Sequence, residues 1–167
     1  MAIDVFAADE QKDEPVDTMR WVRLAKEVLV AEGVKGDAEL SILFVDEHAI
    51  ADLNGRFLGE DGPTDVLAFP MDEHLSEGGR SPDSGGTGPG VNPEPTTEAP
   101  MMLGDLVLCP AVAQRNAESA SRSYEDEMAL LVVHGILHLL GMDHADAEEA
   151  MAMQRREREL LGRFHKQ

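Results

Sequence analysis

Residues 134–144 read HGILHLLGMDH and place His134, His138 and His144 at the spacing H-x3-H-x5-H. Two histidines four residues apart on a helix leave from the same face, one turn apart. Gly141 follows, and glycine permits the left-handed conformation in which many helices end. The chain can then turn back and bring the third histidine toward the other two. Three protein ligands leave a zinc ion one tetrahedral position for water. The stretch therefore predicts one catalytic Zn²⁺ ion.

The glycine after the first histidine limits the chemistry of this site. The spacing resembles that of the metzincin zinc proteases, H-E-x-x-H-x-x-G-x-x-H, in which the glutamate is the general base. Here Gly135 occupies that position, and a glycine cannot accept a proton from a zinc-bound water. Zinc lowers the pKa of its bound water to about 7, so hydroxide is still accessible without a glutamate. A metal-dependent hydrolase of another class, including a peptidase with its base elsewhere, stays open.

The hydrophobic periodicity on both sides of the motif alternates between strands and helices. Asp17, Asp46 and Ser123 each stand where a helix cap is expected, and Pro110 suits a first helical turn. The helix from Asp46 is expected to run through Phe57 with that phenylalanine facing inward. Few strands with helices grouped around them indicate an α+β fold. Strands are predicted at 2–8, 38–45, 64–69 and 102–108, and helices at 17–32, 46–57, 110–120, 123–140 and 146–162.

One segment departs from this pattern. Between His74 and Pro100 the residues are mostly Gly, Pro, Ser and Thr, and apolar residues nearly vanish. Such a segment buries too little surface to offset its ordering entropy. We therefore predict a single domain over residues 1–167 with a disordered insert at 74–100.

Composition and charge restrict the setting of the protein. The apolar stretch around the histidines is too short to span a bilayer, and the first residues alternate like a strand and not like a signal peptide. A single cysteine, Cys109, suits a reducing cytoplasm, and beside a proline at a strand end it is expected to be a small buried hydrophobe. The formal charge is −19. Because phosphate contacts dominate the affinity for nucleic acids, this charge argues against a tight grip on naked RNA.

Three ordered motifs resemble those of the YbeY endoribonucleases, which are bacterial ribosomal-RNA maturation factors. Residues 134–144 are similar to the family pattern H-G-x-L-H-L-x-G-x-D-H. Residues 62–70, GPTDVLAFP, are similar to P-T-[DN]-V-L-S-F-P, and residues 103–109, LGDLVLC, to L-G-D-I-x-[IL]. The resemblance begins near Asp46 and extends to the last predicted helix, interrupted by the insert.

This resemblance implies a fold and an activity. The fold would be a mixed sheet of about four strands with about five helices, the histidine helix at its centre. The activity would be a zinc-dependent endoribonuclease specific for single-stranded RNA, acting in small-subunit rRNA 3′-end maturation and ribosome quality control. The implied partners are rRNA and the ribosome or ribosomal proteins, with no membrane and no DNA. The alternative is a non-catalytic ribosome-assembly factor whose metal is structural; the acidic charge is compatible with it, whereas an open fourth coordination position favours an enzyme.

The resemblance also suggests further site residues. The family carries an arginine five residues before the proline of the P-T motif, where this chain has Leu58. Arg56 stands two residues earlier and is the candidate phosphate-stabilising catalytic residue, although it could equally be a solvated residue near a helix end. Asp143 is either a partner of the metal cage or a turn residue. Asp65 and Asp105 either orient imidazoles or pin strand ends.

Other polar residues are assigned to the surface. His48, His74 and His165 belong to no spacing pattern and are expected at the surface. The arginines of the last helix interleave with Glu157 and Glu159, which predicts a solvated charged face. These arginines are Arg155, Arg156, Arg158 and Arg163.

Overall fold

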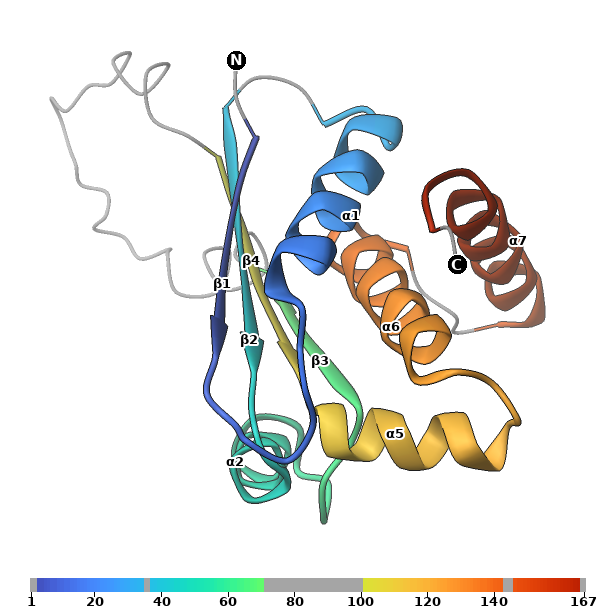
Figure 1. Ribbon diagram of the computed structural model, residues 1–167. Helices are drawn as coiled ribbons and strands as arrows, with labels where there is room; N and C mark the ends of the chain where they lie inside the picture. Colours follow the sequence, from blue (N-terminus) through green and yellow to red (C-terminus); the bar gives the residue numbers. More distant parts are fainter. Residues whose placement is uncertain (1–2, 35–36, 71–100, 143–145, 166–167) are drawn as a thin grey trace, which may run out of the picture.

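The computed structural model describes residues 3–34, 37–70, 101–142 and 146–165, so the predicted insert at 74–100 lies outside the described residues. The described chain forms four strands and five α-helices, which confirms the α+β prediction (Figure 1). The strands are β1 (Ile3–Asp9), β2 (Ala38–Phe44), β3 (Val66–Pro70) and β4 (Met101–Leu108). The helices are α1 (Thr18–Ala31), α2 (Glu47–Leu53), α5 (Pro110–Ser119), α6 (Tyr124–Leu139) and α7 (Ala147–Phe164), with a π-helical segment η1 (Asn54–Leu58) after α2.

The four strands form one mixed sheet in the order β1-β2-β4-β3. β1 and β4 both pair with β2 in parallel, whereas β3 pairs with β4 antiparallel at the edge. Alternate residues of β2 are buried, and Leu40, Ile42 and Phe44 belong to the main core. This alternation is the period-two pattern of a strand with one face against helices.

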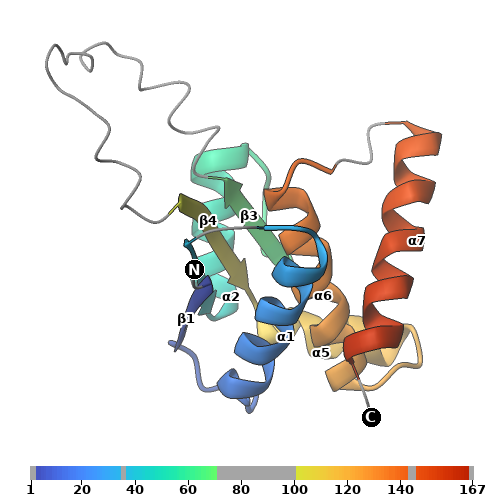
Figure 2. The ribbon, with the colours of Figure 1, turned by 90° about the horizontal axis from the view of Figure 1, so that it is seen from above.

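Two hydrophobic cores lie on opposite faces of the sheet. The main core joins the sheet to α1, α6 and α7, and a smaller one joins the other face to α2 through Ile50 (Figure 2). Helix α6 contacts α1, α5, α7, β3 and β4, so the histidine helix is central, as predicted. The smaller core includes Val45, Leu67, Val107 and Cys109. The expectation that Cys109 is a buried hydrophobe is therefore confirmed.

The predicted caps form at the helix ends. The side chains of Asp17, Asp46 and Ser123 accept hydrogen bonds from main-chain N–H groups in the first turns of α1, α2 and α6. Asp146 does the same for α7 by accepting from Glu149 N at 2.8 Å. After α6 the chain turns with Gly141 at φ 103°, the left-handed conformation expected there.

The helix predicted at 46–57 differs from the structure in its second half. The α-helix ends at Leu53, and the chain continues as η1. A π turn contains an extra residue, so it shifts every later side chain off the 3.6-residue stripe. Phe57 is consequently 61% exposed and rests edge-on against Phe69 at a ring distance of 5.6 Å. The inward position predicted for Phe57 is wrong, while Ile50 is buried as expected.

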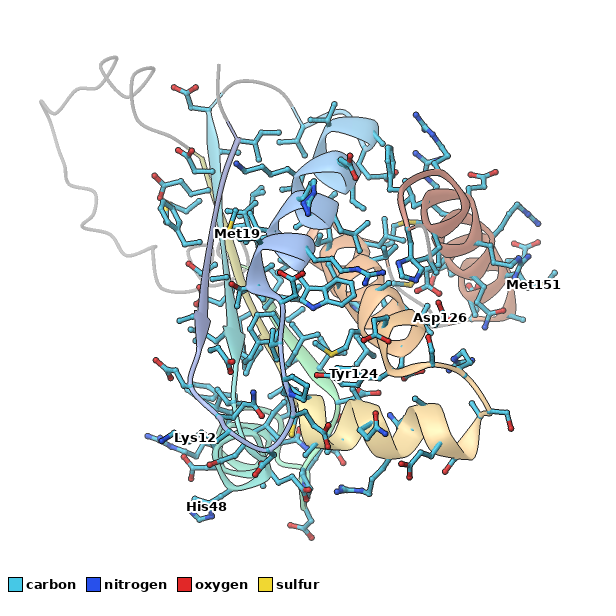
Figure 3. All side chains as sticks on the ribbon, viewed as in Figure 1. Lys12, Met19, His48, Tyr124, Asp126 and Met151 are labelled. Carbon is cyan, nitrogen blue, oxygen red and sulfur yellow. The ribbon has the colours of Figure 1, made fainter. Side chains whose placement is uncertain are left out.

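Two of the histidines predicted at the surface, and the prediction that no segment spans a membrane, can be compared with the fold. His48 is exposed on α2, as predicted, and Figure 3 shows it at the periphery of the molecule. His74 lies outside the described residues. A search of the described helices finds none long and apolar enough to cross a membrane.

Candidate active-site cleft

A cleft of about 520 Å³ opens between α6, β3 and α7. Helix α6 contributes its histidine face and α7 contributes one carboxylate. The strand contributes small apolar residues, and the segment before it contributes Leu58 and Asp65. The remaining lining residues are Val66, Leu67, Ala68, Glu127, Leu130, Leu131, His134, Gly135, His138 and Glu157.

His134 and His138 both line this cleft, as their spacing on one helix predicts. Their ring centroids are 5.2 Å apart with the planes at 69°, and both residues are half-buried. Asp143 and His144 lie outside the described residues. In the part of the chain that the structure describes, no group of three His, Cys, Asp or Glu residues is placed to hold a metal ion. The two imidazoles fit a zinc ion, because neutral imidazole is one of its preferred ligands.

Glu157 of α7 reaches the first histidine of the motif. Its Oε2 lies 2.5 Å from Nδ1 of His134, and its side chain is only 10% exposed. The surface position expected for Glu157 is therefore wrong. A sequence signal existed, since Met153, Glu157 and Leu160 are all buried and follow the i, i+4, i+7 stripe of a helix face. A carboxylate within an apolar stripe requires a partner.

Gly135 brings α6 close to the sheet. A Cβ atom at this position would lie 3.1 Å from Cγ of Leu106 on β4 and closer still to its Cδ1. Leu106 is fully buried in the main core. Gly135 therefore has two consequences. It leaves the motif without a glutamate base, and it allows the close approach of α6 to β4 on which this part of the cleft depends.

A buried glutamate, paired with a more exposed arginine, lies farther along the same face of α6. Glu127 is 3% exposed and lines the cleft, and its Oε1 accepts hydrogen bonds from Nε and Nη2 of Arg122 at 3.1 and 2.6 Å. Asp65 and Glu157 add two further carboxylates, and the described residues lining the cleft include no lysine or arginine. The cleft is therefore better suited to a cation than to a bare phosphate.

The two predicted aspartates separate in the structure. Asp65 lines the cleft, and its Oδ2 accepts a hydrogen bond from Asn116 Nδ2 at 3.0 Å. Its main-chain oxygen also accepts from Cys109 N at 2.9 Å, so Asp65 ties β3 to α5. Asp105 immediately precedes Leu106, which faces α6, and alternation along β4 directs Asp105 to the opposite face. The structure does not bring Asp105 together with the histidines.

Arg56 and Leu58 also take different positions. Leu58 lines the cleft, whereas Arg56 does not belong to its lining and has a side chain 66% exposed. Arg56 Nη1 is 3.3 Å from Oδ2 of Asp52 one turn earlier. The position at which the motif spacing predicts an arginine, Leu58, thus lines the cleft with an apolar side chain.

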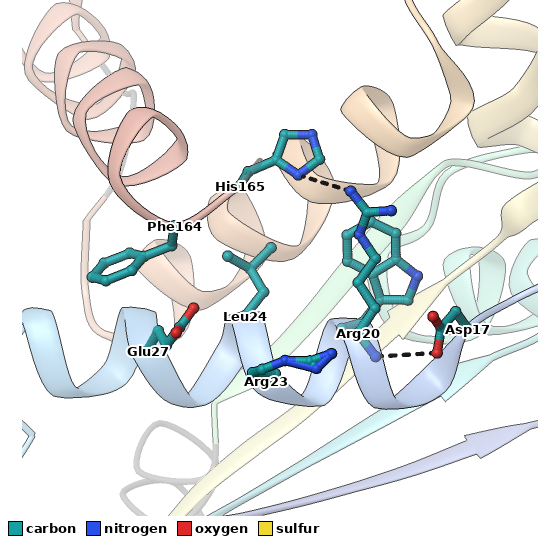
Figure 4. Close-up of a pocket in the computed structure, with 8 residues that line it drawn as sticks. Asp17, Arg20, Arg23, Leu24, Glu27, Phe164 and His165 are labelled. Atoms are coloured by element: carbon teal, nitrogen blue, oxygen red, sulfur yellow. Dashed lines mark hydrogen bonds between the residues drawn. The ribbon is translucent and has the colours of Figure 1, made fainter. Parts of the chain in front are cut away.

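His165, expected at the surface, is instead packed between α1 and α6. Its side chain is 8% exposed, with Nε2 2.8 Å from Oδ1 of Asp126 and Nδ1 3.4 Å from Nη2 of Arg20. Figure 3 labels Asp126 in the first turn of α6. A second cavity of about 230 Å³ lies beside His165 and contains Asp17, Arg23, Glu27 and Phe164 in its lining (Figure 4). This cavity is separate from the histidine cleft.

The charged face predicted for α7 is only partly solvated. Arg155, Arg158 and Arg163 are exposed. Arg156 is half-buried, and its Nε donates to Oε2 of Glu32 at 2.6 Å. This pair fastens α7 to the end of α1, while Nη1 of Arg156 also donates to Glu159 on α7 itself at 2.9 Å. Arg156 therefore has a role in tertiary packing that periodicity alone did not indicate.

Comparison with known proteins places this geometry in a family. Residues 6–165 match the family model described as Endoribonuclease YbeY. A protein of that name from Thermobifida fusca is 47% identical over 161 residues, covering 96% of this chain and 92% of the relative. One from Frankia alni is 45% identical over 157 residues, covering 94% and 80%. The solution structure of TM1509 from Thermotoga maritima matches with a TM-score of 0.53 at 24% identity, covering 95% of this chain and 90% of that chain, which supports the fold.

Proposed function

Because the chain belongs to the YbeY endoribonuclease family, we propose that it hydrolyses phosphodiester bonds of single-stranded RNA with one zinc ion bound by His134, His138 and His144. The observation that carries this proposal is the placement of two half-buried imidazoles, 5.2 Å apart, in the wall of an acidic cleft. The third ligand, His144, is proposed from the sequence motif alone.

The electrostatics of the cleft support a bound cation. Asp65 and Glu157 give the lining a negative charge that repels a phosphodiester, whereas the charge of Glu127 is offset by Arg122. When bound, the zinc ion supplies positive charge for a phosphate oxygen and acidifies a coordinated water. Either a water or the RNA 2′-hydroxyl is the attacking group in this proposal.

Arg56 and Asp143 keep the roles proposed from the sequence. Arg56 would approach a phosphate only after leaving Asp52, since its guanidinium is paired outside the cleft. Asp143 adjoins His144 in the chain and would orient it or its bound water. Asp65 would act indirectly by holding the end of β3 at the edge of the cleft.

The proposed biological substrate is ribosomal RNA. We place the reaction in 3′-end maturation of small-subunit rRNA and in ribosome quality control, in the cytoplasm, as the family implies. The formal charge of −19 favours recruitment through the ribosome or a ribosomal protein over a tight grip on naked RNA. We expect neither DNA nor a membrane as a partner.

A cleavage assay tests this function against its rivals. Purified protein is incubated with single-stranded RNA, double-stranded RNA and casein, with and without a chelator. We expect cleavage of the single strand alone, and its loss with the chelator or in His138→Ala. His48→Ala is the matched control, because this exposed histidine lies on α2 away from the cleft. RNA cleavage that survives both chelation and His138→Ala would overturn the proposal.

Two alternatives predict other outcomes. A metal-dependent hydrolase of another class would degrade casein or a different substrate and leave RNA intact. A ribosome-assembly factor with a structural metal would cleave nothing, and His138→Ala would unfold it. Gly135 argues against the peptidase, and the half-buried position of both histidines in an open cleft argues against a closed structural site.

A further inference from the structure

We propose that Glu157 is a positioning residue for the metal site, which holds His134 in the tautomer protonated at Nδ1. This inference rests on the proposed function, in which His134 is a zinc ligand. The Nδ1–H tautomer carries its lone pair on Nε2, so the carboxylate would select the nitrogen that coordinates the ion.

The geometry of the contact supports this role. Glu157 Oε2 and His134 Nδ1 are 2.5 Å apart, which is within hydrogen-bond distance. The atom of Glu157 that faces the ring is a carboxylate oxygen, which can accept a hydrogen bond from a ring N–H at this position. Both residues line the cleft, with side chains 10% and 30% exposed, and the contact is therefore partly shielded from competing water.

The contact also differs from those of two other glutamates nearby. Glu159, two residues along α7, is an exposed carboxylate that pairs with Arg156 on the same helix. Glu127, the other buried glutamate of the cleft, is paired with Arg122. Glu157 instead crosses between helices to a histidine 23 residues away in the sequence.

Zinc affinity and ring protonation test the proposal together. Glu157→Met removes the acceptor while filling the space in an apolar stripe, and Glu157→Gln retains an amide oxygen that can accept the hydrogen bond. Glu159→Gln removes an equal charge from the same helix and is the control. We expect Glu157→Met to weaken zinc binding by about 10- to 100-fold in a chelator competition assay. Glu157→Gln should lose less, and Glu159→Gln should bind like the unmodified protein.

Nitrogen-15 NMR of the zinc-free protein supplies the second readout. The unmodified protein and Glu157→Gln should show His134 protonated at Nδ1, and Glu157→Met should show a loss of this preference. Thermal unfolding shows whether the variant folds, and Glu157→Ala replaces Glu157→Met if the latter does not. Should neither apolar variant fold, the ring protonation of the unmodified protein and of Glu157→Gln decides.

The failure of each idea is distinguishable. If the unmodified protein binds zinc no better than His138→Ala, the proposed metal site fails, while the NMR result still judges the tautomer. If it binds zinc and Glu157→Met matches Glu159→Gln in affinity, the positioning role is overturned. A neutral His134 ring protonated at Nε2 and not at Nδ1 in the unmodified zinc-free protein overturns it as well.

Discussion

Gly135 on α6 and Leu106 on β4 lie so close that the glycine has no room for a Cβ atom. That atom would be 3.1 Å from Cγ of Leu106 and nearer to its Cδ1, and Leu106 is itself fully buried. The glycine of the histidine motif therefore allows the histidine helix to approach the sheet closely. A glutamate at this position, as in the metzincins, would have to displace core residues.

The first prediction concerns Gly135→Ala. Adding a methyl group to a closely packed core usually costs about 1–3 kcal/mol, and we expect a loss of that size in the free energy of unfolding measured with urea. Gly162→Ala is the control, because that glycine of α7 has nothing within 4 Å of an added Cβ. It should gain up to about 1 kcal/mol from helix propensity. Equal effects of the two substitutions would contradict the packing role.

The second prediction concerns the wall of the cleft. Leu58 lines it where the family arginine stands, so Leu58→Arg should bring a guanidinium toward a bound phosphate. Removing an evolved transition-state donor costs about 10²–10³ in rate, and we expect an introduced one to recover less, about 10-fold in kcat/KM on single-stranded RNA. Met19→Arg adds the same charge on an exposed position of α1 and should have little effect.

A second measurement tests the proposed role of Arg56. If Arg56 contacts phosphate as proposed, Arg56→Ala should cleave RNA more slowly while keeping its metal. Cleavage at an unchanged rate would remove Arg56 from the site and leave only its surface pair with Asp52, which contributes little to stability.

The third prediction concerns zinc and stability. A ligand that binds only the folded state stabilises it by about 2.7 kcal/mol at a hundredfold excess over Kd. Zinc should therefore raise the melting temperature of the unmodified protein measured by calorimetry, and His138→Ala should lose this shift. His48→Ala should keep it. A shift retained in His138→Ala would mean that zinc binds elsewhere.

Local rules predicted much of this fold. The apolar pattern of residues 38–45 predicted β2, and Asp17, Asp46 and Ser123 predicted helix starts, because capping and strand patterns depend only on near neighbours in the chain. The motif likewise predicted that His134 and His138 lie on the same face of one helix. The π turn at η1 was not predicted. Its extra residue breaks the helical period on which the predicted inward position of Phe57 depended.

Contacts between distant segments were harder to foresee. Glu157 and His165 seemed to be surface residues because nothing in α7 itself reveals their partners. The partner of the first is His134 on α6, and those of the second are Asp126 and Arg20. Such pairs depend on how helices pack against one another, which spacing along one helix does not encode.

The last prediction concerns Cys109 and alkaline pH. Burial raises the pKa of its thiol above the ordinary value, so the folded protein disfavours the thiolate. The unfolded chain ionises first, at about pH 8.5. The stabilisation is therefore complete below that pH and is lost as pH rises toward the folded-state pKa, by at most about 1.4 kcal/mol per pH unit. Cys109→Ala should be less stable at pH 7.5 but should lack this extra decline up to pH 9.5 in urea titrations. An identical pH slope in both proteins would contradict the assignment. Tyr124, whose pKa burial also raises, adds its own loss only above about pH 10.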